Sequence, residues 1–289
     1  MEIVPGIHLT PAGAEARVSV GVGPPNAYLL AGTAGAAFID TGYDIDQETR
    51  SRLDYVAALD GAPVKAIIVT HRHADHMGGA AHVHKATGGE IFSNPVEQPS
   101  VDAALEEAAS PGVGEGDGRP RVHRTVEDGE TLDLGGLTLE FIHAPGHTVG
   151  SLAIYAREPR VLFTGDNVLG NVTPSISPDH GDMALYFQTL HRFLDFDMAL
   201  ICPGHGPMVQ DARQWVEKVI QHRLEREEQV LTALRRGHNT VEQMFRDIYP
   251  VLDSRLHSRA QGQIRCHLIK LEREGRVRTT DGAYALTQA

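Results

Sequence analysis

The residues with the clearest chemical potential form one polar run, Thr70-His71-Arg72-His73-Ala74-Asp75-His76, directly after the apolar segment Val64–Val69. Three histidines and an aspartate so close together would be costly to bury without partners, so a purely structural explanation is poor. In an extended chain His71 and His73 point to the same side, because side chains alternate with a period of two residues. These imidazoles can therefore share one metal ion, and Asp75 and His76 are suitably displaced to bind a second.

Further polar signals follow three later strand-like segments. They are Pro145-Gly146-His147 after Leu137–Ile142, Gly165-Asp166 after Arg160–Thr164, and Gly204-His205 after Ala199–Cys202. A single histidine after a glycine is weak evidence, since it is often only a turn residue. The repetition at successive strand ends predicts that these side chains converge with the histidine cluster on one rim.

The elements that must position these residues are short strands mixed with helices, without a strict β-α-β rhythm. Apolar and β-branched runs predict strands at Asn26–Leu30, Ala36–Asp40, Val64–Thr70, Leu137–Ile142, Ser151–Tyr155, Arg160–Thr164 and Ala199–Cys202. Helical patterns cover Gln47–Leu59, Gly79–Thr87 and Met183–Phe193, the last with Asp182 as its N-cap. This mixture favours an α+β fold or a layered αββα core with two stacked sheets.

The C-terminal part of the chain differs in charge. Residues 1–210 contain 12 Lys and Arg against 27 Asp and Glu, a net charge of −15, whereas residues 211–289 contain 14 against 11, a net charge of +3. Glycine and proline also become sparse after residue 211. We therefore expect a catalytic domain over residues 1–210 and a second module over residues 211–289.

Local signals indicate that this second module is a small winged helix. A long helix is expected from Asp211 to Arg236, a capping box at Thr240-Val241-Glu242-Gln243, and a further helix at Ala260–Glu274. Two strands, Arg276–Thr280 and Ala283–Thr287, flank Asp281-Gly282, which is typical of a hairpin with a type I′ turn.

Composition excludes several classes of protein. A net charge of −12 with 16 histidines argues against a general polyanion binder, and the two cysteines, Cys202 and Cys266, fit a reducing compartment and small packing roles. No apolar run reaches the ~18 residues of a membrane span, and the start lacks the pattern of a signal peptide, so we expect a cytoplasmic protein with no membrane partner. Between Asn94 and Arg121, the glycine-rich stretch Ser110–Pro120 reads as a loop, either a substrate-facing lid or a surface excursion.

The sequence resembles the metallo-β-lactamase superfamily of metal-dependent hydrolases. Its His-x-His-x-Asp-His motif is matched in full by residues 71–76, and its later motifs by His147, Asp166 and His205. Its first motif is matched by Ile39-Asp40-Thr41-Gly42. The resemblance covers roughly residues 18–210 and implies a four-layer αβ/βα sandwich with a dinuclear site at one edge.

The same resemblance implies a role for each residue. The first metal would be held by His71, His73 and His147, the second by Asp75, His76 and His205, with Asp166 as the bridge and Asp40 supporting the metal loops without binding metal. Imidazole and carboxylate ligands without cysteine suit zinc, with iron and manganese as alternatives. Zinc lowers the pKa of bound water to about 7, so a metal-bound hydroxide is the expected nucleophile, oriented by Asp75, which could also pass a proton to the leaving group. His143 and His180 are weaker candidates for contact with the ligands or the substrate.

Within the superfamily the sequence is most similar to the beta-lactamase-like protein 2 group, which pairs this core with a C-terminal winged helix and has a mitochondrial endoribonuclease as a representative. The match includes the stretches Asn26–Leu30, Phe163–Gly170 and Pro203–Pro207, and it departs from the group at Asn171–Asp182. We favour hydrolysis of a small-molecule ester, thioester or lactone, because the acidic core would repel a nucleic-acid backbone.

Two alternatives remain open. The first is an RNA phosphodiesterase, which two metals would also suit. The second is a nucleic-acid-binding metal sensor, for which a net charge of +3 over residues 211–289 is weak. Formation of a homo-oligomer is a simpler role for the winged helix.

Overall fold

The structure, a computed structural model, describes residues 1–12, 21–59, 63–108 and 120–287. Contacts divide the chain into two units. The first contains Met1–Ala144, Gly150–Val172 and Asp197–Ala212; the second contains Pro145–Val149, Thr173–Phe196 and Arg213–Ala289. The C-terminal region therefore shares its unit with two internal segments that a boundary drawn at residue 210 assigns to the catalytic domain.

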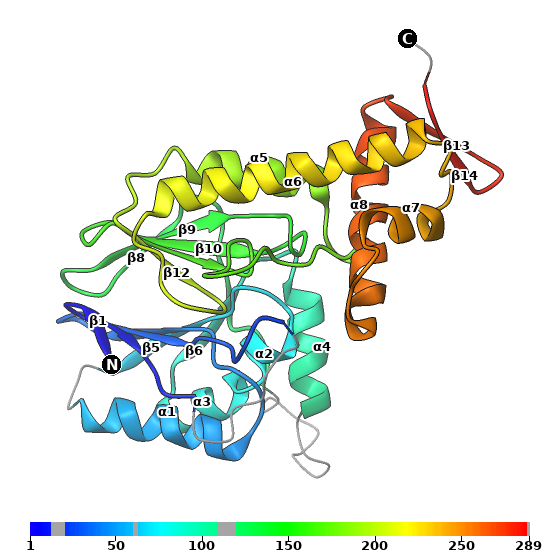
Figure 1. Ribbon diagram of the computed structural model, residues 1–289. Coiled ribbons are helices and arrows are strands. Elements are labelled where there is room, and N and C mark those ends of the chain that lie inside the picture. The colour runs from blue at the N-terminus through cyan, green and yellow to red at the C-terminus, as the bar shows by residue number, and fades with distance from the viewer. Residues whose placement is uncertain (13–20, 60–62, 109–119, 288–289) are drawn as a thin grey trace. The chain divides into compact units, whose positions relative to one another are not determined.

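Two sheets form the framework of the first unit (Figure 1). The seven-stranded sheet has the order β1 (Glu2–Val4), β2 (Ile7–Leu9), β3 (Tyr28–Ala31), β4 (Ala36–Ile39), β5 (Val64–Ile68), β6 (Glu90–Ser93), β7 (Arg124–Thr125). The five-stranded sheet has the order β12 (Leu200–Pro203), β11 (Val161–Gly165), β10 (Leu152–Ala156), β9 (Thr138–His143), β8 (Thr131–Asp133). Strands β4 to β7 are parallel, and so are β11 and β12, whereas the other neighbours are antiparallel.

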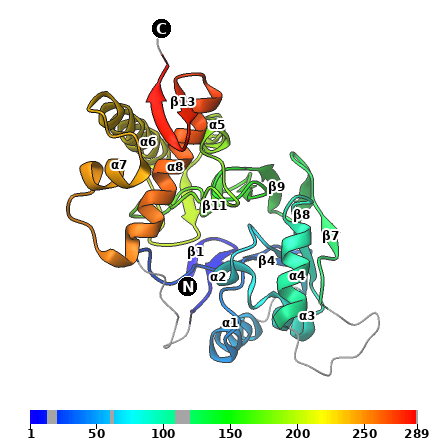
Figure 2. The same ribbon diagram turned by 90° about the vertical axis from the view of Figure 1, so that its right-hand side faces the viewer.

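Strands of the larger sheet bury both faces, with alternate residues in two different cores. On β4, Ala37 and Ile39 belong to the core shared with the five-stranded sheet, which includes Phe141 and Phe163. Phe38 instead faces the core formed with three helices, α1 (Asp46–Ala58), α3 (Ala80–Thr87) and α4 (Gln98–Ala108). The period of two thus explains why these strands are apolar throughout, and gives the first unit a helix–sheet–sheet order (Figure 2).

Most elements predicted from the sequence are present, but α4 was missed. The predicted strands and the helices α1, α3 and α5 (Met183–Phe193) begin and end within two residues of the expected positions. Between Asn94 and Arg121 the sequence predicted only the loop Ser110–Pro120, and the residues before that loop form the helix α4, which buries Val101 and Leu105. Residues 110–119 of the predicted loop lie outside the described residues, so the lid stays a prediction.

The second unit contains α5, α6 (Ala212–Arg235), α7 (Val241–Ile248), a 3₁₀ turn (Ser254–Leu256), α8 (His257–Arg273), β13 (Val277–Thr280) and β14 (Ala283–Leu286). Asp182 caps α5 by accepting from the N–H groups of Ala184 and Leu185, and the Thr240 capping box of α7 is present. Asp281 and Gly282 have φ values of 51° and 76°, as a type I′ hairpin requires. The winged-helix prediction is therefore confirmed element by element.

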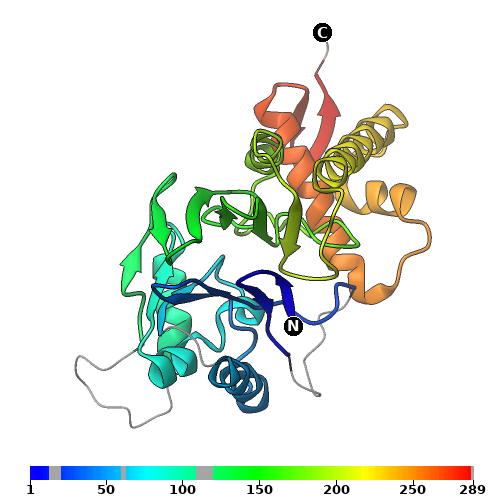
Figure 3. The same ribbon diagram turned by 90° about the vertical axis from the view of Figure 1, so that its left-hand side faces the viewer.

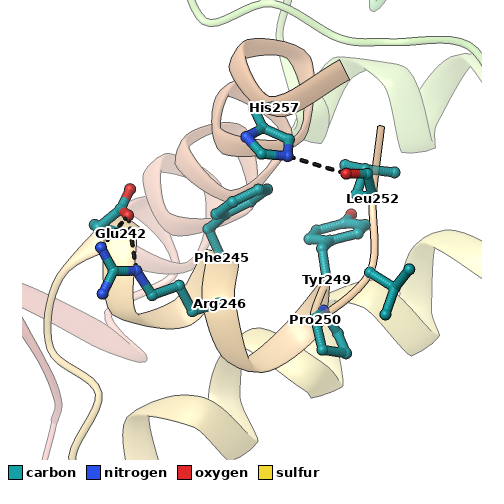
Figure 4. Close-up of a pocket in the computed structure, with 8 residues that line it drawn as sticks. Glu242, Phe245, Arg246, Tyr249, Pro250, Leu252 and His257 are labelled. Atoms are coloured by element: carbon teal, nitrogen blue, oxygen red, sulfur yellow. Dashed lines mark hydrogen bonds and ion pairs between the residues drawn. The ribbon is translucent and has the colours of Figure 1, made fainter. Parts of the chain in front are cut away.

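An open pocket of about 500 Å³ lies where α7 meets α8 (Figure 4). Its aromatic side chains contact other groups of the same unit: Tyr249 lies 5.9 Å from the Phe245 ring and under the Arg226 guanidinium, and His257 Nε2 donates to the carbonyl oxygen of Leu252 at 3.1 Å. None of the site residues predicted from the sequence lines this pocket. Among the described helices, none combines the length and the apolar character that a membrane crossing needs.

A buried carboxylate, Glu227 on α6, joins the helices of the second unit to the hairpin. Its oxygens lie 2.7 Å from Lys270 Nζ on α8 and 2.8 Å from Arg276 Nη1 beside β13. Burial alone would raise the pKa of Glu227, but His267, Lys270 and Arg276 outweigh it and lower the pKa to about 2.

We expect Glu227→Gln to destabilise the second unit by about 2–3 kcal/mol at pH 7, near the lower end for breaking a buried ion pair because Arg276 is partly exposed. A depressed pKa stabilises the fold above the unfolded-state value and loses that contribution as the pH falls. The difference between wild type and variant should therefore shrink between about pH 4.5 and pH 2. Urea unfolding followed by fluorescence of Trp215, the single tryptophan, reports on this unit. A difference that stays constant across that pH range would contradict the assignment.

Candidate metal centre

The residues of the candidate centre in the first unit follow the carboxyl ends of parallel strands, in the two sheets that Figure 3 shows from the side opposite to Figure 2. Asp40 follows β4 and His71 follows β5 in the larger sheet, whereas Asp166 follows β11 and His205 follows β12 in the smaller one. Because the carboxyl ends of parallel neighbours meet at one edge, each sheet presents its pair at that edge. The short helix α2 (Ala74–Met77) then carries Asp75 and His76.

These side chains form two overlapping clusters. Ligand atoms of His71, His76 and Asp166 lie within 4.8 Å of one another, and so do those of Asp75, His76 and His205. His205 Nε2 lies 3.3 Å from Asp75 Oδ2 and 3.7 Å from Asp166 Oδ2. His76 therefore belongs to both clusters, and Asp166 lies against each.

Asp40 and Thr70 fix the orientation of two histidines from behind. Asp40 Oδ2 lies 2.7 Å from His76 Nδ1 and accepts a hydrogen bond from Thr70 Oγ1 at 2.8 Å. Because the Thr70 hydroxyl proton is donated to Asp40, the same oxygen accepts from His71 Nδ1 at 3.0 Å. This network favours a proton on Nδ1 in both rings, so Nε2 is the nitrogen of each ring that can bind a metal, and His71 Nε2 lies 2.9 Å from Nδ1 of His73.

The His205 loop is held by a segment from the other sheet. Pro24 O accepts from His205 Nδ1 at 3.1 Å, which leaves its Nε2 as the ligand atom. Asn26 Nδ2 donates to the carbonyl oxygens of Pro203 and Gly206, and Tyr28 Oη donates to that of Pro203 at 2.7 Å. Neither Asn26 nor Tyr28 was predicted as a site residue, because nothing in the local sequence shows that they meet residues so distant in the chain.

The geometry of the centre fits a bound cation. The buried His76 Nε2 has no hydrogen-bond partner among the described residues and faces Asp166 Oδ1 at 3.3 Å. A nitrogen lone pair and a carboxylate oxygen at that distance need a shared proton or a metal ion between them. Gly204 comes so close that a Cβ atom there would lie 2.4 Å from Asp166 Oδ1 and 2.7 Å from His76 Cε1. Only a residue without a side chain leaves this space open.

The charges around the centre also favour a bound cation. Burial disfavours the charged form of His76, but Asp166 and Asp40 outweigh it and hold the pKa of the imidazole well above its ordinary value. Burial would raise the pKa of Asp75, yet the hydrogen bond with His205 and the charge of His76 hold it below its usual range. The anionic field that would retain a proton on His76 equally favours a divalent cation.

The other predicted residues lie as follows. His147 is in the second unit, where its Nδ1 lies 2.9 Å from Ser175 O, so its Nε2 is the atom left for a ligand. His143 ends β9, and its backbone N–H donates to Asp128. His180 precedes α5, and its carbonyl oxygen accepts from Val149 N. Neither His143 nor His180 belongs to a metal-ligating cluster among the described residues.

Both cysteines are buried, as small packing residues would be. Burial raises the pKa of Cys202, and it raises that of Cys266 to about 12. Their thiols are therefore neutral near pH 7 and unsuited to act as nucleophiles.

Comparison with known proteins identifies the family. Residues 20–205 match the model of the metallo-beta-lactamase superfamily, and residues 240–284 match the beta-lactamase associated winged helix domain. The chain belongs to the metallo-beta-lactamase superfamily, whose members are hydrolases that usually bind divalent metals.

Relatives span different shares of the chain. A beta-lactamase-like protein 2 homolog from Caenorhabditis elegans is 30% identical over 73% of this chain, and the match covers 65% of that relative. The Drosophila melanogaster homolog is 28% identical over 89% of this chain and 85% of its own length. An atrochrysone carboxyl ACP thioesterase from Aspergillus fumigatus is 27% identical over 72% of this chain, and the match spans 59% of that protein. The chain thus covers less than two thirds of the length of two of these relatives, 65% and 59%.

Solved structures support the fold along nearly the whole chain. A metallo-beta-lactamase family protein from Thermus thermophilus matches with a TM-score of 0.76 and 24% identity over 99% of this chain and 100% of its own. A beta-lactamase domain protein from Burkholderia ambifaria matches with a TM-score of 0.80 and 22% identity over 99% of this chain and 93% of its own. The prediction of a metallo-β-lactamase fold with a C-terminal winged helix is confirmed.

Proposed function

We propose that the protein is a dinuclear metal-dependent hydrolase that cleaves a small-molecule ester, thioester or lactone. The observation that carries the proposal is the pair of overlapping clusters that share the buried His76 imidazole, with Asp166 as a member of one cluster and 3.7 Å from His205 of the other. The first metal would be held by His71, His73 and His147, and the second by Asp75, His76 and His205, with Asp166 between them. Zinc suits these nitrogen and oxygen donors best, with iron and manganese as alternatives.

Two divalent cations, when bound, would act as Lewis acids and lower the pKa of water to near neutrality. The side chains of the protein would orient the attacking water relative to the substrate. Asp75 is ionised at neutral pH because its pKa is depressed, so it can accept a hydrogen bond from water and hold it in line with the substrate. Its side chain is 16% exposed, whereas those of His76 and His205 are almost fully buried. Of these three, Asp75 is therefore the group most open to an incoming substrate.

Charge and relatives support a small substrate. Residues 1–210 carry a net charge of −15, which disfavours approach of a nucleic-acid backbone. One relative carries the name of an acyl-carrier-protein thioesterase, so a thioester is the first substrate class to test.

An RNA phosphodiesterase is the second candidate. It is favoured by the sequence similarity to a beta-lactamase-like protein 2 homolog along most of both chains. In addition, 22 of the 26 basic residues are arginine. Arginine suits phosphate recognition because its guanidinium can donate two parallel hydrogen bonds.

An activity panel separates the two candidates. The zinc-loaded protein is assayed on an acyl thioester, a lactone, a phosphodiester and single-stranded RNA, with Asp75→Asn as the matched control because it keeps the shape of the side chain. We expect hydrolysis of the thioester or lactone, reduced in the variant by about 100-fold or more, within the range for removing a general base. Cleavage of RNA without ester hydrolysis would favour the second candidate, and equal activity of wild type and variant would contradict the role of Asp75.

A further inference from the structure

Glu97 is a buried carboxylate outside the ligand set that joins two chain segments beside the candidate centre. It lies directly before α4, and its side chain is 1% exposed. Its Oε2 accepts a hydrogen bond from Arg72 Nε at 2.6 Å, and its Oε1 accepts from the backbone N–H of Gly150 at 3.2 Å. Each carboxylate oxygen of Glu97 therefore accepts a hydrogen bond, one from the segment of Arg72 and the other from the segment of Gly150.

Both segments adjoin predicted ligands of the first metal. Arg72 is the residue between His71 and His73, and Gly150 is the residue that returns the chain from the His147 loop toward β10. The same two segments are joined once more nearby, because Leu152 N–H donates to Thr70 O at 2.8 Å. Glu97 thus acts at the point where the His71–His73 loop and the start of β10 are held together.

The contact with Gly150 is sterically specific. A Cβ atom at position 150 would lie 2.7 Å from Glu97 Cγ and 2.9 Å from Glu97 N, closer than any real Cβ contact. The segment can therefore reach the carboxylate only because residue 150 has no side chain.

We propose that Glu97 and Arg72 are positioning residues that hold the His71–His73 loop in the geometry required by the first metal. A buried carboxylate needs a paired cation, and a charge-assisted hydrogen bond from the guanidinium fixes the backbone that carries both histidines. Partners one step behind metal ligands typically change metal affinity by about 10- to 100-fold when removed. This inference rests on the proposed dinuclear centre.

Metal binding tests the proposal without any substrate. Glu97→Gln keeps an oxygen for Gly150 N–H but turns an amide donor toward Arg72, and Gly150→Ala keeps both charges but separates the backbone from Glu97. Val161→Ala, a core residue at the start of β11 and so at the opposite end of that strand from Asp166, is the control for simple loss of stability. Zinc content and affinity are measured by chelator competition, and the Co²⁺ spectra are compared with those of His73→Ala and His205→Ala.

We expect two tightly bound metals in wild type and in Val161→Ala. Glu97→Gln and Gly150→Ala should each keep one tightly bound metal and bind the other about 10- to 100-fold more weakly. The Co²⁺ spectra of both variants should resemble that of His73→Ala. Two tight metals in both variants, or a spectrum like that of His205→Ala, would overturn the role of Glu97. If wild type itself binds fewer than two metals, it is the proposed function that fails.

Discussion

An Asp166→Ala variant is expected to lose metal-dependent hydrolysis almost completely and to retain at most one tightly bound metal. Asp166 lies close to both histidines, with carboxylate oxygens 3.3 Å from His76 Nε2 and 3.7 Å from His205 Nε2. Its removal takes a ligand from the cluster with His71 and His76, and a neighbouring carboxylate from His205 of the other cluster. The loss of activity should exceed the roughly 100-fold upper end measured for partners behind metal ligands, because Asp166 would itself be a ligand. Turnover at saturating zinc and metal content after dialysis are the measurements.

Asp166→Asn is the matched control for this variant. It keeps the shape of the side chain and one oxygen donor but removes the negative charge, so it should bind metal more weakly than wild type and better than Asp166→Ala. Retained activity in Asp166→Ala with bound metal lost would refute the two-metal mechanism. Unchanged metal content and activity would remove Asp166 from the centre altogether.

Gly204→Ala should inactivate the protein although glycine has no reactive group. The added methyl group would lie 2.4 Å from Asp166 Oδ1 and 2.7 Å from His76 Cε1, so one of these two side chains must move. Overpacking of this kind typically costs about 1–3 kcal/mol of stability. We expect metal affinity to fall together with activity, as measured by zinc titration and by hydrolysis of the substrate identified in the panel.

Gly262→Ala provides the comparison for that experiment. Gly262 is a buried residue of α8, and the nearest atom to an added Cβ is Pro178 Cδ at 3.6 Å, an ordinary contact. Alanine there should stabilise the helix by up to about 1 kcal/mol and leave metal binding unchanged. Equal behaviour of the two variants would mean that the close approach at Gly204 does not matter to the centre.

Elements with strong local signals were predicted well. The capping box at Thr240, the Asp182 cap and the Asp281-Gly282 turn depend on neighbours within a few residues, so their sequence specifies them. Of the five strands that were missed, β1, β2, β7 and β8 have only two or three residues and give no alternation to read, and the fifth is β6 with four. The helix α4 was missed because the neighbouring glycine-rich stretch dominated the interpretation of that region.

The candidate ligands were predictable because their residue types and strand-end positions are visible in the sequence. The residues that position them were not. Pro24 and Asn26 meet the His205 loop from about 180 residues away, and Glu97 joins Arg72 to Gly150 across three separate segments. Such contacts depend on the packing of two sheets and leave no periodic pattern along the chain. Thr70, next to the first histidine, could have been found from its position, but its hydrogen bond to Asp40 could not.

The division of the chain into two units has a consequence for protein synthesis. The His147 loop lies in the second unit, where Gly146 approaches Tyr186 of α5 and Thr189 Oγ1 donates to Pro145 O. The helix α5 is in turn tied to α8 through the ion pair of Asp182 with Arg273. On a ribosome these late residues emerge after the whole first unit. The growing chain therefore cannot complete the contacts that support the His147 loop until α8 has been made.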